Sequence, residues 1–268
     1  MALIKYTFNS KVLGEQVNIA VVLPTFCGAH AGKSLDEVYQ NGKKFRTLYV
    51  LHGGSDDCTF YVRNTGIERY ACEGGFAAVL PEVKLSFYSD MIYGGKYFTY
   101  LSEELPLVVQ SLFPLSEKSE DHFVVGNSMG SHGAMKWAFR CPEFFNSAAG
   151  MSGVSGVEEL GFFDRMSCAQ NNPVKNSFGT PEEFFHSEND LKYLAKKLVE
   201  SGKKIPRLYS CCGTEDELTY KGSREFINYA KEIGLPISWH EGPGKHNWGF
   251  WDPWLKKIIQ YMEIGVEE

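Results

Sequence analysis

The chain has 268 residues, a formal net charge of −6, and 43% hydrophobic and 22% charged residues. These values are ordinary for a globular protein and argue against a disordered or fibrous chain. Acidic and basic residues are mixed along the sequence, so the charge pattern predicts neither a nucleic-acid partner nor an anionic membrane partner.

Strand-like and helix-like segments follow one another along the chain. A hairpin is predicted at 3–8 and 17–23, and further strands at 47–51, 76–80, 122–125, 147–151, 207–211 and 237–240. Helical spacing occurs at 63–72, 100–112, 129–139, 191–199, 223–232 and 254–262. This alternation predicts an α/β fold: a mostly parallel, twisted, eight-stranded sheet with helices on both faces. Functional residues are then expected just after the strands.

Residues 1–268 read as a single domain, because no repeat, low-complexity tract or linker divides them. One connection is unusually long, and a lid or cap insertion is expected around 153–205. An ordinary surface excursion is the alternative.

The N-terminal residues lack the pattern of a signal peptide, and no apolar run reaches the roughly 18 residues that span a bilayer. The sequence therefore predicts a cytoplasmic protein. Seven cysteines are expected to remain thiols in that reducing compartment. The adjacent Cys211 and Cys212 lie in an apolar strand-like run, which favours buried packing over redox or metal chemistry.

The predicted strand 122–125 runs into Gly126-Asn127-Ser128-Met129-Gly130 and then into a helix. This is the Gly-x-Ser-x-Gly pattern in its strand-turn-helix setting, where glycines relieve collisions around a sharply turned nucleophile. We therefore expect Ser128 to be a nucleophile.

A serine hydroxyl needs a base, and in this arrangement the order along the chain is serine, acid, histidine. Asp216 follows the strand 207–211 and is the expected acid, with Glu215 and Glu217 as neighbouring competitors. His246 lies in a Gly- and Pro-containing loop and is preferred as the base over His240, which closes a strand.

Oxyanion stabilisation is expected from backbone amides. Met129 follows the nucleophile and supplies one amide, and Gly54 is preferred over Ser55 for the second. His52, in the same loop, is interpreted as structural. Four aromatic residues flank the expected site and are candidates for the substrate pocket, although aromatic residues are equally often core: Phe87, Tyr88, Trp248 and Trp251.

No metal site or cofactor is predicted. The segment Gly28-Ala29-His30-Ala31-Gly32-Lys33-Ser34 resembles a phosphate-binding loop, but its spacing is one residue short, so it reads as a surface loop. The sequence contains no His-Glu-x-x-His motif and no paired Cys-x-x-Cys array that would indicate zinc.

Several short motifs occur together in a familiar order: His52-Gly53-Gly54, Ile67-Glu68-Arg69, Ser86-Phe87-Tyr88-Ser89-Asp90, Gly126-Asn127-Ser128-Met129-Gly130, Gly213-Thr214-Glu215-Asp216 and His246-Asn247-Trp248. Over nearly its whole length the chain resembles the esterase D-like esterases of the α/β-hydrolase fold, and within them the bacterial tributyrin esterases. The resemblance implies a cofactor-free serine carboxylesterase with Ser128, Asp216 and His246 as its triad. It also implies homo-oligomeric assembly.

The implied substrates are short-chain acyl or aryl esters, such as acetyl, butyryl or feruloyl esters, as small molecules or linked to carbohydrate. Two alternatives share the same catalytic residues: an S-formylglutathione hydrolase-type thioesterase, and an acyltransferase to a sugar or alcohol. A catalytically silent binding fold is a third alternative, which the intact serine, acid and histidine set disfavours.

Overall fold

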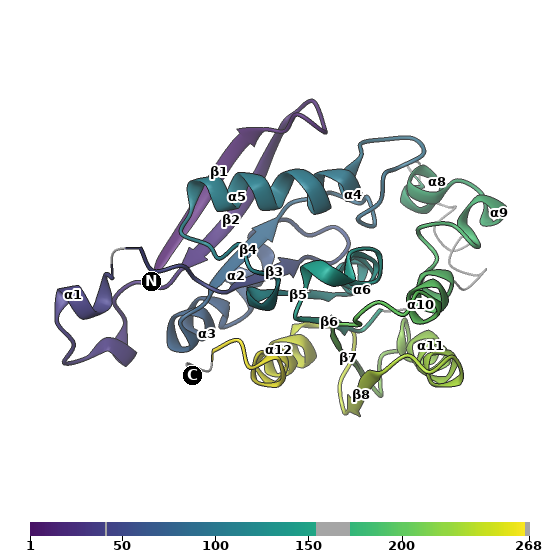
Figure 1. The fold of residues 1–268 in the computed structure, drawn as a ribbon. Helices are drawn as coiled ribbons and strands as arrows, with labels where there is room; N and C mark the ends of the chain where they lie inside the picture. Colours follow the sequence, from purple (N-terminus) through teal and green to yellow (C-terminus); the bar gives the residue numbers. More distant parts are fainter. Residues whose placement is uncertain (41, 154–171, 266–268) are drawn as a thin grey trace.

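Eight strands form one sheet in the order β1-β2-β4-β3-β5-β6-β7-β8, as seen in a computed structural model that describes residues 1–40, 42–153 and 172–265 (Figure 1). The strands are β1 (Ala2–Asn9), β2 (Gln16–Leu23), β3 (Thr47–Leu51), β4 (Ala77–Pro81), β5 (His122–Asn127), β6 (Ser147–Met151), β7 (Arg207–Gly213) and β8 (Ile237–Gly242). The first hairpin pairs antiparallel, and β2 pairs antiparallel with β4, whereas all pairs from β4 to β8 are parallel.

Helices cover both faces of this sheet. The α-helices of the described residues are α1 (Leu35–Val38), α2 (Phe60–Asn64), α3 (Ile67–Gly74), α4 (Tyr97–Thr99), α5 (Leu105–Leu112), α6 (Met129–Arg140), α8 (Pro173–Phe178), α9 (Pro181–Phe184), α10 (Leu191–Glu200), α11 (Tyr220–Glu232) and α12 (Trp248–Met262). A π-helical turn, Tyr100–Glu104, joins α4 to α5. The predicted fold class, a mostly parallel sheet between helices, is confirmed.

The alternation of side chains along the central strands explains why the core has two halves. In β3, Tyr49 and Leu51 pack in the cluster that contains α5, α6, α10 and α11. Leu48 and Val50 point the other way, into the cluster that contains α3 and α12. Because both faces are covered, the whole of β3 is buried, which is the pattern expected of a parallel strand.

Two helix predictions need correction. The segment 63–72, expected as one helix, is two helices that meet at Gly66, whose N–H donates to the Asp252 carboxylate over 2.9 Å. The last helix begins at Trp248 rather than 254, because the Asn247 side chain accepts from the Gly249 N–H and Pro253 lies inside the helix. A proline in a sequence suggests a helix boundary more readily than a helix interior.

The expected insertion around 153–205 is only partly visible. Residues 154–171 lie outside the described residues, and the remainder forms α8, α9 and α10. Lid behaviour and the single-domain organisation stay predictions.

The expectation that every cysteine is a thiol is wrong for one pair, because a disulfide joins Cys27 to Cys72, 45 positions further along the chain. Cys211 and Cys212 are buried thiols, as expected. Cys168 lies outside the described residues.

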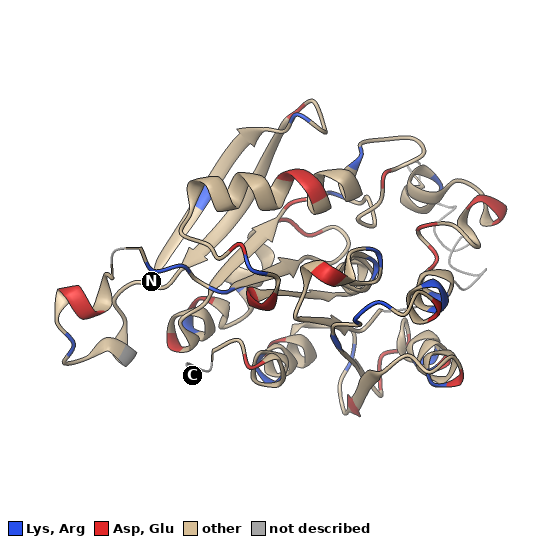
Figure 2. Ribbon diagram, viewed as in Figure 1, with Lys and Arg blue, Asp and Glu red and all other residues tan. Residues whose placement is uncertain are grey.

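Charged residues of both signs are interspersed along the ribbon (Figure 2). Within the part of the chain that the structure describes, no helix combines the length and apolar character needed to traverse a bilayer.

Candidate active site

Ser128 lies at the sharp turn between β5 and α6. Its backbone has φ 53° and ψ −119°, and its N–H donates to the Met151 carbonyl over 2.9 Å. A β-carbon at Gly126 would collide with the Gly130 carbonyl, and one at Gly130 would collide with the Leu51 carbonyl. The two glycines of the sequence motif are therefore required by the close packing of the turn against its neighbours.

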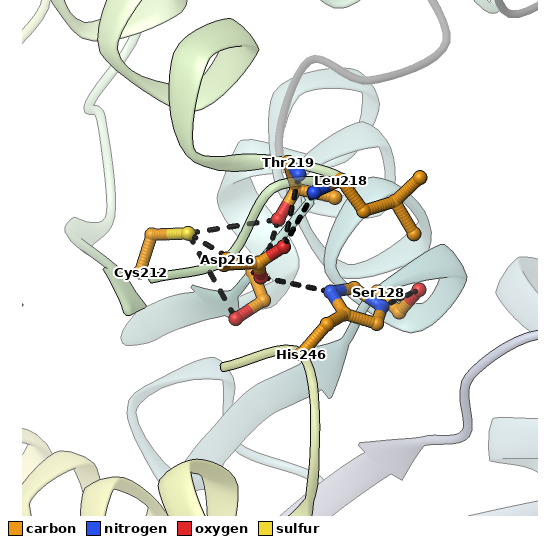
Figure 3. A network of polar contacts seen from close by, with 7 residues as sticks. Ser128, Cys212, Asp216, Leu218, Thr219 and His246 are labelled. Atoms are coloured by element: carbon orange, nitrogen blue, oxygen red, sulfur yellow. Dashed lines mark hydrogen bonds and ion pairs between the residues drawn. The ribbon is translucent and has the colours of Figure 1, made fainter. Parts of the chain in front are cut away.

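The structure brings the three predicted residues together, although they come from distant parts of the sequence. His246 Nε2 lies 2.9 Å from Ser128 Oγ, and His246 Nδ1 lies 2.8 Å from Asp216 Oδ2 (Figure 3). Ser128 follows β5, Asp216 follows β7, and His246 lies in the loop between β8 and α12. Each therefore lies just beyond the end of a strand, at one edge of the sheet.

Asp216 is held by more groups than His246 alone. The Thr219 hydroxyl donates to its Oδ2 over 2.7 Å, and the N–H groups of Leu218 and Thr219 donate to its Oδ1 over 3.1 and 3.0 Å. The Cys212 thiol lies 3.6 Å from Oδ2 (Figure 3). The carboxylate is thus locked in one orientation by hydrogen bonds from its own turn.

Thr219 and Cys212 are functional candidates that the sequence analysis missed. A signal for Thr219 exists, because an Asp three residues before a Thr, at the start of a helix, is the pattern of a side chain that accepts hydrogen bonds from the following turn. Cys212 carries no such signal, because a cysteine in an apolar strand is most often simply buried, although its thiol contacts Asp216 and Thr219 in the turn that follows β7.

Electrostatics favour an ionised Asp216. Burial alone would raise the pKa of Asp216, but hydrogen bonds from His246 and Thr219 and the charge of His246 outweigh burial and lower the pKa from 3.8 to about 2. A carboxylate that stays charged across the neutral range fixes the imidazole tautomer that leaves a lone pair at Nε2, the atom that faces Ser128.

The competing carboxylates and the competing histidine lie elsewhere. Glu215 and Glu217 are exposed, and the described contacts of His246 include Asp216 but neither glutamate. His240 stacks on Tyr209 with ring centroids 4.5 Å apart.

The loops that carry the acid and the base are cross-bonded to each other. The Thr214 N–H donates to the Gly242 carbonyl over 2.9 Å, and the Glu215 N–H donates to the Gly244 carbonyl over 3.0 Å. A β-carbon at Gly213 would collide with the Gly244 carbonyl, so the two backbones touch.

The loop after β3 lies against the nucleophile turn. A β-carbon at Gly53 would approach the Asn127 side-chain nitrogen to 3.0 Å, and Gly54 is exposed beside it. Within the described residues, the N–H groups of Met129 and Gly54 have no backbone acceptor. An oxyanion site needs backbone amides that are not paired with the protein and that converge on one point.

His52 holds this loop in place. Its Nε2 accepts from the Val83 N–H over 3.1 Å, so its Nδ1 carries the proton and donates to the Gly53 carbonyl over 2.7 Å. The Tyr88 hydroxyl donates to the His52 carbonyl over 2.8 Å. Burial lowers the pKa of the His52 imidazole, which keeps it neutral. The structural interpretation of His52 agrees with these contacts.

The four aromatic candidates are not equivalent. Trp251 packs edge-on against the His246 ring with centroids 4.9 Å apart, and Trp248 packs against Trp251 in turn. The Phe87 carbonyl accepts from the buried Lys136 amine over 2.9 Å, which fixes its loop. For Tyr88 the core alternative fits better, because its side chain is fully buried and its hydroxyl supports the loop after β3.

The lowered pKa of Asp216 predicts how stability depends on pH. A carboxyl group with a lowered pKa stabilises the folded state above its unfolded pKa, and this contribution is lost as the pH falls through the folded pKa. A pKa of about 2 against 3.8 corresponds to about 2 kcal/mol of unfolding free energy. The stability advantage of wild type over Asp216→Asn should therefore shrink between pH 5 and pH 2.5 in urea denaturation. A difference in unfolding free energy between the two proteins that does not change with pH would contradict the lowered pKa of Asp216.

The fold and this arrangement define a class of protein, because a serine at a strand-turn-helix junction of such a sheet is typical of the serine hydrolases of the α/β-hydrolase type. The chain belongs to the family described as "Putative esterase", whose model matches residues 89–262.

Similar proteins agree with this class. An acetyl esterase of Caldicellulosiruptor saccharolyticus is 26% identical over 98% of both chains. The substrate-bound fluorophosphonate-binding serine hydrolase F of Staphylococcus aureus is 34% identical, with a TM-score of 0.85 over 98% of both chains. An S-formylglutathione hydrolase of the same organism is 33% identical, with a TM-score of 0.83 and the same coverage. The chain is a serine hydrolase that cleaves carboxylic esters.

Proposed function

We propose that Ser128 is the nucleophile of this esterase, with His246 as its general base and Asp216 as the group that orients His246. The observation that carries the proposal is the continuous hydrogen-bonded chain from Ser128 Oγ through both imidazole nitrogens to a buried carboxylate. A nucleophile, a base and an orienting group within hydrogen-bond reach form the general signature of an activated serine.

The reaction then has two halves. His246 takes the proton of Ser128 as Oγ attacks the ester carbonyl, and the imidazolium returns that proton to the leaving alcohol. Water, activated by the same imidazole, then releases the acid from the acyl-enzyme. In both halves the N–H groups of Met129 and Gly54 are proposed to stabilise the oxyanion.

The proposed substrates are esters of short acyl chains, and the name of the acetyl esterase relative supports this size. Phe87, Trp248 and Trp251 are proposed to line the pocket. The edge of Trp251 against the His246 ring places an apolar side chain directly beside the base.

The acyl specificity is tested with p-nitrophenyl esters from acetyl to octanoyl. Each missing or added methylene changes transition-state binding by about 1–3 kcal/mol in a fitted apolar pocket. We therefore expect kcat/KM to peak at acetyl to butyryl and to fall at least about tenfold by octanoyl. A maximum at octanoyl would exclude the short-chain assignment while leaving the nucleophile assignment intact.

A thioesterase is the second candidate, and the likeness to an S-formylglutathione hydrolase at 33% identity favours it specifically. Both activities use the same acyl-enzyme and differ in the leaving group. The discriminating measurement is kcat/KM for S-formylglutathione beside the best p-nitrophenyl ester. A larger value for the thioester would make thioester hydrolysis the principal activity.

A further inference from the structure

Three metal-ligating side chains from two separate segments meet outside the catalytic site. Cys27 and His30 lie in the connection after β2, and Cys72 lies near the end of α3. One ligand atom from each lies within 4.8 Å of the others, and Cys27 Sγ is 3.4 Å from His30 Nδ1. The Cys-x-x-His spacing brings the first two together because residues 28–30 form a 3-10 turn.

The tautomer of His30 is the one a metal needs. The Cys27 N–H donates to His30 Nδ1 over 3.3 Å, so this nitrogen is the acceptor and carries a lone pair. The same nitrogen faces the Cys27 sulfur. An ion between Cys27 Sγ and His30 Nδ1 would take this lone pair in place of the Cys27 N–H, and the thiolate and imidazole would then be two of the four ligands of a zinc site.

The distance between sulfur and nitrogen also fits a shared ion. In a tetrahedral site with Zn–S of about 2.3 Å and Zn–N of about 2.0 Å, neighbouring sulfur and nitrogen ligands lie about 3.5 Å apart and two sulfurs about 3.8 Å apart. The observed 3.4 Å between Cys27 Sγ and His30 Nδ1 matches the first value. The sulfurs of Cys27 and Cys72 are joined in the disulfide, so they must move apart to the second value after reduction.

The surroundings leave room for a fourth ligand. His30 and Cys72 line a cavity of about 350 Å³ whose wall also contains Glu37 and Glu73. Water or a carboxylate from this wall therefore has access to the ion. Two thiolates and one Zn²⁺ make a neutral group, so the lysines that share the cavity do not oppose it.

We propose that Cys27, Cys72 and His30 form a zinc site in the reduced protein, and that this site and the Cys27–Cys72 disulfide exclude each other. A thiol reductant supplies two electrons and two protons, which converts the disulfide to two thiols while the reductant is oxidised to its own disulfide. Binding of Zn²⁺ then releases both thiol protons, because only thiolates ligate the ion.

The position of the site indicates a structural role. α3 ends just before β4 begins, so Cys72 lies toward the edge of the sheet where the parallel strands start, whereas Ser128, Asp216 and His246 follow strand ends (Figure 1). The ion would fasten the connection between β2 and β3 to α3 without touching the esterase site. Sequence analysis missed it because the third ligand is 45 positions from the first.

The test is zinc binding by the whole chain after reduction with a phosphine and removal of metal. Zn²⁺ is titrated in competition with a chromophoric chelator, and Co²⁺ is substituted to reveal thiolate-to-metal charge-transfer absorption. We expect one zinc per chain for wild type and for Cys141→Ser. This variant is the matched control, because it removes a free thiol outside the proposed site. Losing one direct ligand should weaken binding at least ~100-fold in Cys27→Ser, Cys72→Ser and His30→Ala, since loss of a mere supporting contact already costs 10–100-fold.

Circular dichroism melting of each variant in the absence of metal separates loss of the site from loss of the fold. Reduced wild type that takes up no zinc, or Cys27→Ser that binds it as tightly as wild type, overturns the proposal. So does a cobalt complex without thiolate absorption. Oxidised protein, with its disulfide verified by mass spectrometry, should bind zinc at least ~100-fold more weakly; equal binding would show that the two states are compatible and also overturn it.

Discussion

Replacing Ser128 with alanine is expected to lower kcat for ester hydrolysis by on the order of 10⁶-fold, the size of loss seen when a serine hydrolase loses its nucleophile. The physical reason is that the variant lacks the Ser128 hydroxyl oxygen to which the acyl group is attached in the acyl-enzyme. His246 and the amides of Met129 and Gly54 remain, so only the weak residual rate from binding and oxyanion stabilisation should persist. Single-turnover and steady-state kinetics with p-nitrophenyl acetate measure the loss.

Ser131 offers a matched control for this experiment. It lies one turn further along α6, and its hydroxyl is buried without a hydrogen-bond partner among the described residues. Ser131→Ala should keep activity within a few-fold of wild type. Because Ser128 and His246 act as one unit, the double variant Ser128→Ala/His246→Ala should lose no more than the first substitution alone. If the loss of kcat in the double variant equalled the product of the two single losses, Ser128 and His246 would not act as one unit.

Asp216→Asn is expected to reduce kcat/KM by on the order of 10⁴-fold with little change in fold. An asparagine can present its amide N–H₂ to His246 Nδ1 and so favour the tautomer with a proton on Nε2. That proton would then face Ser128 Oγ, and the imidazole could not accept the serine proton. The loss is measured by comparing kcat/KM of wild type and Asp216→Asn on the preferred short-chain ester.

Glu217→Gln is the corresponding control, because Glu217 is an exposed carboxylate in the same turn. It removes a negative charge at a similar place in the sequence but breaks no contact with His246. Activity close to wild type is expected. If Glu217→Gln and Asp216→Asn had similar effects, general charge near the site rather than a specific orienting bond would be responsible.

Much of the site was predictable because parallel strands impose a rule on position. Each of Ser128, Asp216 and His246 could be located by finding a strand and reading the residues just after it. Gly126 and Gly130 added a second, independent signal, because the sharp turn leaves no room for a β-carbon against Gly130 in the first case and against the Leu51 carbonyl in the second. The fold class followed from the same alternation of strands and helices.

The features that sequence reasoning missed depend on contacts between distant segments. Gly66 breaks a helix because its N–H finds Asp252, a partner far along the chain. The sequence left Tyr88 open between pocket and core, and the choice depends on its hydroxyl donating to the His52 carbonyl, 36 positions away. Cys27 and Cys72 approach each other only when the connection after β2 folds against α3. No pattern within a short stretch of sequence indicates these contacts between distant residues.

The cross-bonded loops after β7 and β8 have a consequence for the entropy of catalysis. Because Thr214 and Glu215 are tied to Gly242 and Gly244, Asp216 and His246 lose their relative freedom when adjacent strands pair, long before any ester arrives. Folding rather than substrate binding thus meets the entropic cost of aligning these two groups. Ser128 is already within hydrogen-bond distance of His246 in the folded chain, so all three side chains are aligned before an ester binds.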